Sequence, residues 1–345
     1  MGCVLVQDGQ IIGEGHTQAA GGHHAEIEAL HAAQHDAVET AGATAYVTLE
    51  PCSHHGPTPP CVDALIRAQV KHVIAAMQDP NPQVAGQGFA RLQAAGISTQ
   101  CGLLEAEARE INMGFVARMT RGRPWLRLKM AASLDGKTAL NNGKSQWITG
   151  AAARADGHHW RARACAILTG IGTVLKDDPR LTARLEGVEE TSIRQPLKVI
   201  VDSRLETPLT AQILTRGATL IATAQANTQA DAQKIAALHT RGAEVVVLPD
   251  ANQQDKVDLT ALMQTLAQRG INEVHGEAGH RLSGSLLRAG LVDELLLYYA
   301  PTLLGAAARD MFQLPELTEL EGRRDFVMTD LRRMGNDLRM TLRPR

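Results

Sequence analysis

The sequence of 345 residues has few aromatic residues, no excess of positive charge and no long apolar run. Aromatic side chains make up only 3% of it, and 35 Lys and Arg residues nearly balance 37 Asp and Glu residues. A nucleic-acid-binding protein usually has a basic face, often with aromatic side chains that stack on bases. No stretch reaches the ~18 consecutive apolar residues of a membrane-spanning helix. These absences argue against nucleic-acid and membrane partners, so we expect a small-molecule substrate.

The sequence also lacks the marks of an exported protein. No basic residue precedes the first apolar run, so the N-terminus does not resemble a secretion signal. The cysteines are odd in number and mostly far apart in the chain, at Cys3, Cys52, Cys61, Cys101 and Cys165. In a reducing compartment, such cysteines are metal ligands or buried thiols more often than disulfides. We therefore expect a cytoplasmic protein.

Segments of strand and helix length alternate along the chain, which predicts an α/β fold. The length suggests about two domains, at roughly 150 residues per domain. The Gly and Pro residues within 121–124 interrupt the alternation most strongly. We therefore predict one domain over residues 1–122 and a second over residues 123–345.

The first domain is expected to begin with a hairpin that turns at Asp8 and Gly9. Its other elements are expected to be strands at 45–49 and 70–77 and helices at 24–34, 62–68, 85–95 and 105–119. The second domain is expected to have strands at 125–130, 166–169, 197–201, 219–223, 244–248, 273–275 and 294–299, helices that include 151–163 and 259–268, and a C-terminal hairpin over 326–342.

Three residues of metal-binding type stand at a characteristic spacing in the first domain. His24 lies two positions before Glu26, and Cys52, which follows Pro51, is itself followed by Cys61. A catalytic zinc ion takes three protein ligands and keeps one position open for water. His24, Cys52 and Cys61 supply those ligands, and Glu26 is placed to move a proton. The combination of His-x-Glu with Pro-Cys and a second Cys is the mark of zinc nucleobase deaminases.

Each of these features has a more ordinary explanation when it stands alone. A His-x-Glu pair is usually a solvated helix face, and two cysteines are often core residues. A structural zinc site would more often have a fourth Cys or His ligand, and none is obvious at the right spacing. Together and in this order, the residues favour a catalytic zinc over a structural zinc or no metal.

Eight residues separate the two cysteines, where deaminases of free nucleosides or bases usually have two. With this insert, segment 48–61 resembles the bifunctional deaminase–reductases of riboflavin biosynthesis. The resemblance continues over nearly the whole chain, in segments 78–82, 132–136, 145–149, 177–182 and 292–301. It implies a cytidine-deaminase-like domain followed by a dihydrofolate-reductase-like domain.

The resemblance also implies two reactions on one small molecule. The first domain would use zinc to deaminate 2,5-diamino-6-ribosylamino-4(3H)-pyrimidinone 5′-phosphate. The second would use NADPH to reduce the ribose of 5-amino-6-(5-phosphoribosylamino)uracil to ribityl. Asp79 and Asn81 match substrate-binding positions of the family, although Asp-Pro-Asn-Pro by itself indicates a turn.

Residue chemistry alone says less about the second domain. No Gly-x-Gly-x-x-Gly opens a helix after a strand, so a Rossmann domain is not supported. The glycines of 169–173 and 276–279 suggest phosphate-binding turns, although plain turns are commoner. Lys129 and Asp135 are candidate polar groups near the reacting carbon. The resemblance implies cofactor contacts from Ala131, Trp147, Thr173, Asp177, Ser203, Gly279, His280, Arg281, Leu282, Ser283, Gly284 and Ser285. It implies substrate contacts from Ser145, Arg161, Leu181, Arg184 and Glu277.

Three positions depart from the family pattern. Pro57 stands where the family usually carries Arg or Lys, and His280 and Arg281 replace the usual Pro-Thr. Family members also carry a helix and a Pro-Asn-Pro segment before the first strand. From the N-terminal difference and Pro57, we expect a less stable deaminase domain that binds its substrate weakly. The change at 280–281 is expected to adjust only the cofactor affinity.

Two other functions stay open at this point. One is a zinc deaminase of another pyrimidine or purine with a degenerate reductase domain. The other is a non-catalytic, zinc-stabilised scaffold, which would have no need of a general base such as Glu26. We expect the chain to form a homo-oligomer, although its residues do not fix the number of copies.

Overall fold

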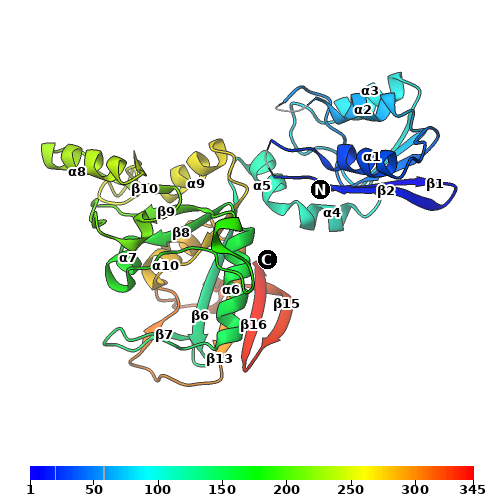
Figure 1. The fold of residues 1–345 in the computed structure, drawn as a ribbon. Helices are drawn as coiled ribbons and strands as arrows, with labels where there is room; N and C mark the ends of the chain where they lie inside the picture. The colour runs from blue at the N-terminus through cyan, green and yellow to red at the C-terminus, as the bar shows by residue number, and fades with distance from the viewer. Residues whose placement is uncertain (20, 57–58) are drawn as a thin grey trace. The chain divides into compact units, whose positions relative to one another are not determined.

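The computed structural model describes residues 1–19, 21–56 and 59–345, so the expectation about Pro57 lies outside the described residues. The chain forms two compact units, Met1–Arg121 and Gly122–Arg345. The split falls one residue before the expected boundary. Both units are α/β, as the alternation of segments predicts (Figure 1). Within the described residues, no helix is both long and apolar enough to cross a membrane.

The first unit is built on a sheet whose described strands run in the order β2-β1-β3-β4-β5. The first two strands form the expected hairpin, with Asp8 and Gly9 at positive φ in its turn, and β3, β4 and β5 are parallel to one another. The strands are β1 (Gly2–Gln7), β2 (Gln10–His16), β3 (Thr44–Val47), β4 (His72–Ala75) and β5 (Ser98–Cys101). The short, polar β5 was not predicted, because only one of its four residues is apolar.

Three helices pack on one face of this sheet (Figure 1): α1 (Ala25–His35), α2 (Cys61–Arg67) and α3 (Gln87–Ala94). The first of them lies unusually close to β2. A Cβ at Gly13 would stand 2.3 Å from the Ala29 carbonyl oxygen, and one at Gly15 would stand 2.3 Å from the Ala25 carbonyl oxygen. Only glycine permits this approach. It fixes the beginning of α1, where His24 and Glu26 lie.

The prediction of a single helix over 105–119 is wrong. The structure has two helices there, α4 (Glu105–Ile111) and α5 (Met113–Arg121), which meet at Asn112. The Asn112 side-chain amide donates to the Ala108 carbonyl oxygen at 3.0 Å. The Asn112 backbone N–H donates to the same carbonyl oxygen at 3.2 Å, and Asn112 itself leaves the helical conformation at φ −110° and ψ 18°. Asn side chains that bond to nearby backbone groups are common at helix ends.

The second unit contains, in its described residues, a sheet with the strand order β11-β10-β9-β8-β12-β6-β13-β16-β15. All neighbouring pairs from β11 to β13 are parallel, and the last two strands are antiparallel. The strands of the sheet are β6 (Trp125–Ser133), β8 (Ala166–Gly170), β9 (Leu197–Val201), β10 (Thr219–Thr223), β11 (Ala243–Val247), β12 (Glu273–Gly276), β13 (Glu294–Ala300), β15 (Phe326–Met334) and β16 (Asp337–Pro344). The predicted strands and C-terminal hairpin are all present, with ends shifted by a few residues.

Helices and short elements connect these strands. The helices are α6 (Ala151–Arg163), α7 (Ile171–Asp177), α8 (Gln229–Thr240), α9 (Leu259–Gln268) and α10 (His280–Arg288). Single 3-10 turns occur at Glu190–Ser192, Gln212–Leu214 and Leu320–Gly322, and β7 (Lys137–Ala139) pairs with β14 (Arg309–Asp310). β6, the strand of this sheet that precedes β8 in the chain, lies on one side of β8, and β9, which follows it, lies on the other. In open α/β sheets, ligands bind at such a reversal, beyond the carboxyl ends of the strands.

Candidate active sites

The three predicted zinc ligands converge at the amino ends of two helices. His24 directly precedes α1, Cys61 is the first residue of α2, and Cys52 lies in the turn after β3. The His24 Nδ1 atom lies 3.5 Å from Cys52 Sγ and 3.3 Å from Cys61 Sγ. Tetrahedral zinc with bonds of ~2.0–2.3 Å separates its ligand atoms by roughly 3.6 Å. The donor set and its spacing therefore fit a zinc ion.

The two thiols form a strongly coupled pair. The hydrogen bond from the Cys61 thiol, reinforced by His24, lowers the pKa of Cys52. The backbone N–H of Cys61 also donates to Cys52 Sγ, at 3.2 Å. Hydrogen bonding to Cys52 and burial raise the pKa of Cys61. One thiolate therefore forms readily in this environment, and a bound metal ion would draw the proton from the other thiol.

Glu26 stands beside the ligands in the first turn of α1. Its side chain is buried. Burial raises the pKa of its carboxyl, and the nearby Cys52 thiolate adds to the effect while His24 opposes it. A raised pKa makes the carboxylate a stronger base toward the proton of an attacking water. The geometry suits a group that moves protons next to the metal rather than one that binds it.

Glu50 lies in segment 48–61, but the sequence did not predict a role for it. It is buried, and its carboxylate accepts hydrogen bonds from the backbone N–H groups of Asp79, Gly86 and Gly88 at 2.8–3.0 Å. These bonds tie loop 78–88 to the turn that carries Cys52. Its position directly before Pro51 and Cys52 is the sequence feature that could have indicated this role.

The loop held by Glu50 contains both predicted substrate residues of the first unit. The Asp79 carboxylate accepts from the Asn81 N–H at 2.8 Å, and the Asn81 side chain accepts from the Gln83 N–H at 3.1 Å. These bonds make the turn that Asp-Pro-Asn-Pro indicates. Burial raises the pKa of Asp79, with a contribution from Glu50, and the Cys52 thiolate acts in the same direction. The Glu50 carboxylate, two residues before Cys52, accepts from the Asp79 N–H and so holds Asp79 beside the segment that carries this ligand.

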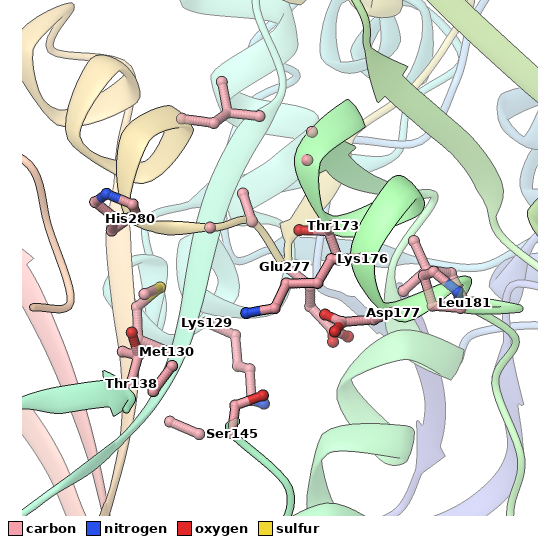
Figure 2. A pocket seen from close by; sticks show the side chains of 18 of the residues that line it. Lys129, Met130, Thr138, Ser145, Thr173, Lys176, Asp177, Leu181, Glu277 and His280 are labelled. Atoms are coloured by element: carbon pink, nitrogen blue, oxygen red, sulfur yellow. The ribbon is translucent and has the colours of Figure 1, made fainter. Parts of the chain in front are cut away.

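A cavity of about 1130 Å³ opens beyond the carboxyl ends of β6, β8, β9 and β12 (Figure 2). Drug-sized ligands usually occupy ~300–1,000 Å³, so this space suits a dinucleotide together with a substrate. The predicted residues that line it are Ala131, Ser145, Trp147, Arg161, Thr173, Asp177, Leu181, Arg184, Glu277, Gly279, His280, Arg281 and Leu282.

Four predicted cofactor residues are not part of this lining. Ser203 lies just after β9, and its carbonyl oxygen accepts from the Ala224 N–H. Ser283 is buried, with its hydroxyl on the Ala278 carbonyl oxygen, and Ser285 donates to the Arg281 carbonyl oxygen within α10. Gly284 permits a close approach to Gln313, whose carbonyl oxygen would stand 2.1 Å from a Cβ. Only the first turn of α10 therefore faces the cavity.

A partly buried ion pair forms one wall of the cavity. The Arg161 guanidinium donates with two nitrogens to the Glu277 carboxylate, one of them at 2.8 Å, and with the third to the Thr182 carbonyl oxygen at 3.1 Å. Burial alone would raise the pKa of Glu277, but Arg161, helped by His275, holds it well below the usual range. The bidentate geometry fixes both side chains in position.

Two further basic side chains lie nearby. Arg184 approaches His158, with 3.3 Å between Nη2 and Nε2. Burial, together with the charges of Arg161 and Arg184, lowers the pKa of His158 to about 4. The imidazole therefore stays neutral at physiological pH and leaves the positive charge to the two arginines.

Lys129 lines the cavity, as do Lys176 and Arg154, which the sequence did not reveal. Burial lowers the pKa of Lys129, and Glu277 partly offsets this. In Figure 2, Lys129, Lys176 and Glu277 surround one common space. Lys176 Nζ also donates to the Gly143 carbonyl oxygen at 2.6 Å, which anchors loop 140–146. No sequence motif indicates that Lys176 and Arg154 line the cavity.

Asp135, the other candidate near the reacting carbon, lies in a turn and is not among the residues that line the cavity. Its carboxylate accepts from the Ser133 hydroxyl at 2.5 Å and from the Gly305 N–H at 2.8 Å. The Ser133 hydrogen bond lowers its pKa to about 2. Its contacts are those of a turn-stabilising residue.

Family models divide the chain in the same way as the fold. Residues 1–77 match the cytidine and deoxycytidylate deaminase zinc-binding region, and residues 124–339 match the RibD C-terminal domain. The fold and the two sites thus define a two-domain α/β enzyme, a zinc deaminase joined to a reductase.

Similar proteins extend along both domains. The chain is 46% identical to the riboflavin biosynthesis protein RibD of Escherichia coli, over 98% of this chain and 91% of that protein. Its fold matches a structure of Acinetobacter baumannii RibD with a TM-score of 0.89 and 42% identity, over 100% of this chain and 92% of the other. A deaminase/reductase structure from Thermotoga maritima matches with a TM-score of 0.84 and 32% identity, over 100% and 91%. The chain belongs to the RibD family.

This membership confirms the main functional prediction from the sequence. The chain is a bifunctional deaminase and reductase of riboflavin biosynthesis, with zinc in its deaminase domain and NADPH in its reductase domain. The two other functions, a degenerate reductase and a zinc-stabilised scaffold, do not fit this family.

Proposed function

We propose that residues 1–122 deaminate a diaminopyrimidinone that carries a ribosylamino 5′-phosphate, and that residues 123–345 reduce the ribose of the product. The observation that carries this proposal is the presence of both sites in one chain. His24, Cys52, Cys61 and Glu26 form one, and the cavity with the Arg161–Glu277 pair forms the other.

In the deaminase site, His24, Cys52 and Cys61 would hold zinc, which supplies an activated water near neutral pH. Glu26 takes a proton from the attacking water and delivers it to the departing amino group. The ring carbon gains a carbonyl oxygen, and the nitrogen leaves as ammonia. Asp79, held in its loop by Glu50, is proposed to contact the heterocycle together with Asn81.

In the reductase site, NADPH supplies a hydride when bound. The first turn of α10 with Gly279 to Leu282, together with Ala131, Trp147, Thr173 and Asp177, would hold the cofactor. A helix amino terminus of this kind suits a diphosphate. Ser283 and Ser285 would act through the backbone, because their hydroxyls donate to the Ala278 and Arg281 carbonyl oxygens. Ser203 and Gly284 are proposed to contact the cofactor from outside the cavity lining.

The substrate is proposed to lie between the ion pair and the arginine beside it. Arg184 and Arg161 suit the 5′-phosphate, since a guanidinium matches phosphate oxygens. Ser145 and Leu181 would contact the rest of the molecule, and Glu277 orients Arg161. Lys129 is placed to face the reacting carbon, where its lowered pKa makes proton transfer easier.

We further propose that the enzyme works in the cytoplasm as a homo-oligomer. All five cysteines are free, which suits a reducing compartment. The edge strand β15 exposes Val327, Met328 and Leu331, and exposed apolar edge strands favour pairing between copies. Light scattering of the purified chain measures the mass, and a monomer at working concentrations would contradict the oligomer.

The experiment that tests the two reactions is incubation of the purified chain with the diaminopyrimidinone ribosyl phosphate, with and without NADPH. Without NADPH, mass spectrometry should show only the deaminated product and ammonia. With NADPH, a second product heavier by two hydrogens should follow. Reduction without deamination of the diamino substrate, or no product at all from a zinc-loaded chain, would contradict the proposal.

A further inference from the structure

A second group of metal-binding side chains lies on the outer side of α1, next to the catalytic ligands but separate from them. It consists of His23, Glu28 and His31. The ligand atoms of the three residues all lie within 4.8 Å of one another. His23 precedes His24 in the chain, yet it does not belong to the catalytic triangle.

The positions of these three residues follow from the helix. Glu28 and His31 are three residues apart on α1, so their side chains lie on the same face. His23 reaches this face from the loop before the helix, with its Nδ1 2.9 Å from the Glu28 Oε1. The rings of His23 and His31 stand edge to face, with centroids 5.1 Å apart at 77°. Two imidazoles and one carboxylate therefore converge on one point.

This donor set has a definite chemistry. Two His and one Glu form the protein ligands of a class of zinc sites, with a fourth position left for water. Imidazole ligands select zinc, cobalt, nickel and copper over magnesium or calcium. We propose that His23, Glu28 and His31 bind a second divalent transition-metal ion, of the zinc type, that the deamination reaction does not use.

The site should be weaker than the catalytic one for two reasons. It has no thiolate, and His23 and His31 are exposed, so the bound ion exchanges freely with solvent. The single charge of Glu28 offsets the positive charge of the ion only in part, and the amino end of α1 adds to the repulsion. The ion would nevertheless tie the loop before α1 to the second turn of that helix, and binding to the folded state alone raises its stability.

The experiment uses the full chain loaded with one equivalent of zinc, to which Co²⁺ is added. Equilibrium dialysis should give a second bound ion per chain. Its visible spectrum should show cobalt bands without the thiolate-to-metal absorption that Cys52 and Cys61 would produce. The unfolding temperature of the first unit should rise when Co²⁺ is added to the chain that already holds one equivalent of zinc.

Two variants and one matched control define the site. His31→Ala removes a ligand, and Glu28→Gln keeps a similar shape but removes the charge. Each should weaken the second ion at least ~10-fold. His35→Ala is the control, because His35 is an exposed histidine at the end of the same helix, beside Asp36, and the described residues give it no third ligand. It should bind the second ion as the unchanged chain does.

The outcomes separate this inference from the proposed deaminase site. Cys52→Ser should lose the catalytic zinc and keep the second ion. Binding of only one ion per chain, equal loss in His35→Ala and His31→Ala, or thiolate absorption from the second ion would overturn the proposal. Retained catalytic zinc in His31→Ala shows that the helix is still folded.

Discussion

The zinc centre and the reductase cavity are built in different ways. The centre takes all its ligands and Glu26 from residues 24 to 61, on two adjacent helix starts and one turn. The cavity takes its lining from residues 129 to 309, on strands, helices and loops far apart in the chain. A site of the first kind has a ligand pattern that is visible in the sequence. A site of the second kind depends on the topology of a sheet.

The pKa values of the carboxyl groups in the two sites are also shifted in opposite directions. In the zinc centre, burial raises the pKa of Glu26, which makes its carboxylate a stronger proton acceptor. In the cavity, Arg161 outweighs the same effect of burial and holds the pKa of Glu277 well below its usual range. Glu26 is thus suited to exchange protons, and Glu277 to remain a fixed charge. Variants in each site should therefore fail in different ways.

The largest expected effect comes from Glu26→Gln. The amide cannot exchange a proton, so deaminase kcat should fall ~10²-fold or more, while zinc content and reductase activity stay unchanged. Ammonia release, metal analysis and NADPH oxidation with the deaminated substrate measure the three quantities. Glu39→Gln, an exposed residue after α1, is the control. Normal ammonia release by Glu26→Gln would refute the role of this residue.

Arg184→Ala should give the opposite pattern. Loss of a hydrogen bond to a charged group costs about 1.5–3 kcal/mol, so the reductase KM should rise roughly 10- to 100-fold. Zinc content and deamination should not change. Arg241→Ala removes an arginine that is not among the cavity residues and should have no effect. A KM that stays within twofold of the original would place the phosphate elsewhere in the cavity.

The contrast between the sites explains what the sequence could predict. His24, Cys52 and Cys61 carry a rare ligand pattern, and runs such as Leu197–Val201 are long enough to be recognised as buried strands. Lys176 and Arg154 lie on helices with no distinctive pattern, and only the fold brings them to the cavity. Glu50 is a similar case, because its role depends on backbone N–H groups some 30 residues further along the chain. Asn112 ends helix α4 through a local change of its backbone conformation, which hydrophobic periodicity does not indicate.

A smaller effect is expected from the pH dependence of the reductase unit. Burial lowers the pKa of His158 from 6.5 to about 4. Between these values, the unfolded chain binds a proton that the folded chain does not, so the free energy of unfolding falls as the pH is lowered from 6.5 to 4. The contribution is at most about 1.4 kcal/mol per pH unit, and solvent screening reduces it.

His158→Gln should flatten this slope in denaturant titrations at several pH values. His159→Gln alters the exposed neighbouring histidine and should keep the slope. The slope of the His158 variant will not vanish, because burial also lowers the pKa of His275. An unchanged slope in His158→Gln would show that this imidazole is protonated in the folded state.

The smallest effect tests whether the two units unfold separately. Helix α8 begins with a capping box, in which the Thr228 hydroxyl accepts from the Asp231 N–H at 3.0 Å and the Asp231 carboxylate accepts from the Thr228 N–H at 3.0 Å. Thr228→Ala should cost about 1 kcal/mol. The loss should lower only the transition that NADPH raises, and leave the one that a chelator lowers. Thr240→Ala, which removes a side-chain bond at the other end of α8, should cost less because no cap is lost. If Thr228→Ala lowered both transitions equally, the two units would unfold as one. The two reactions would then still use separate sites, but the units that carry them would not be independently stable.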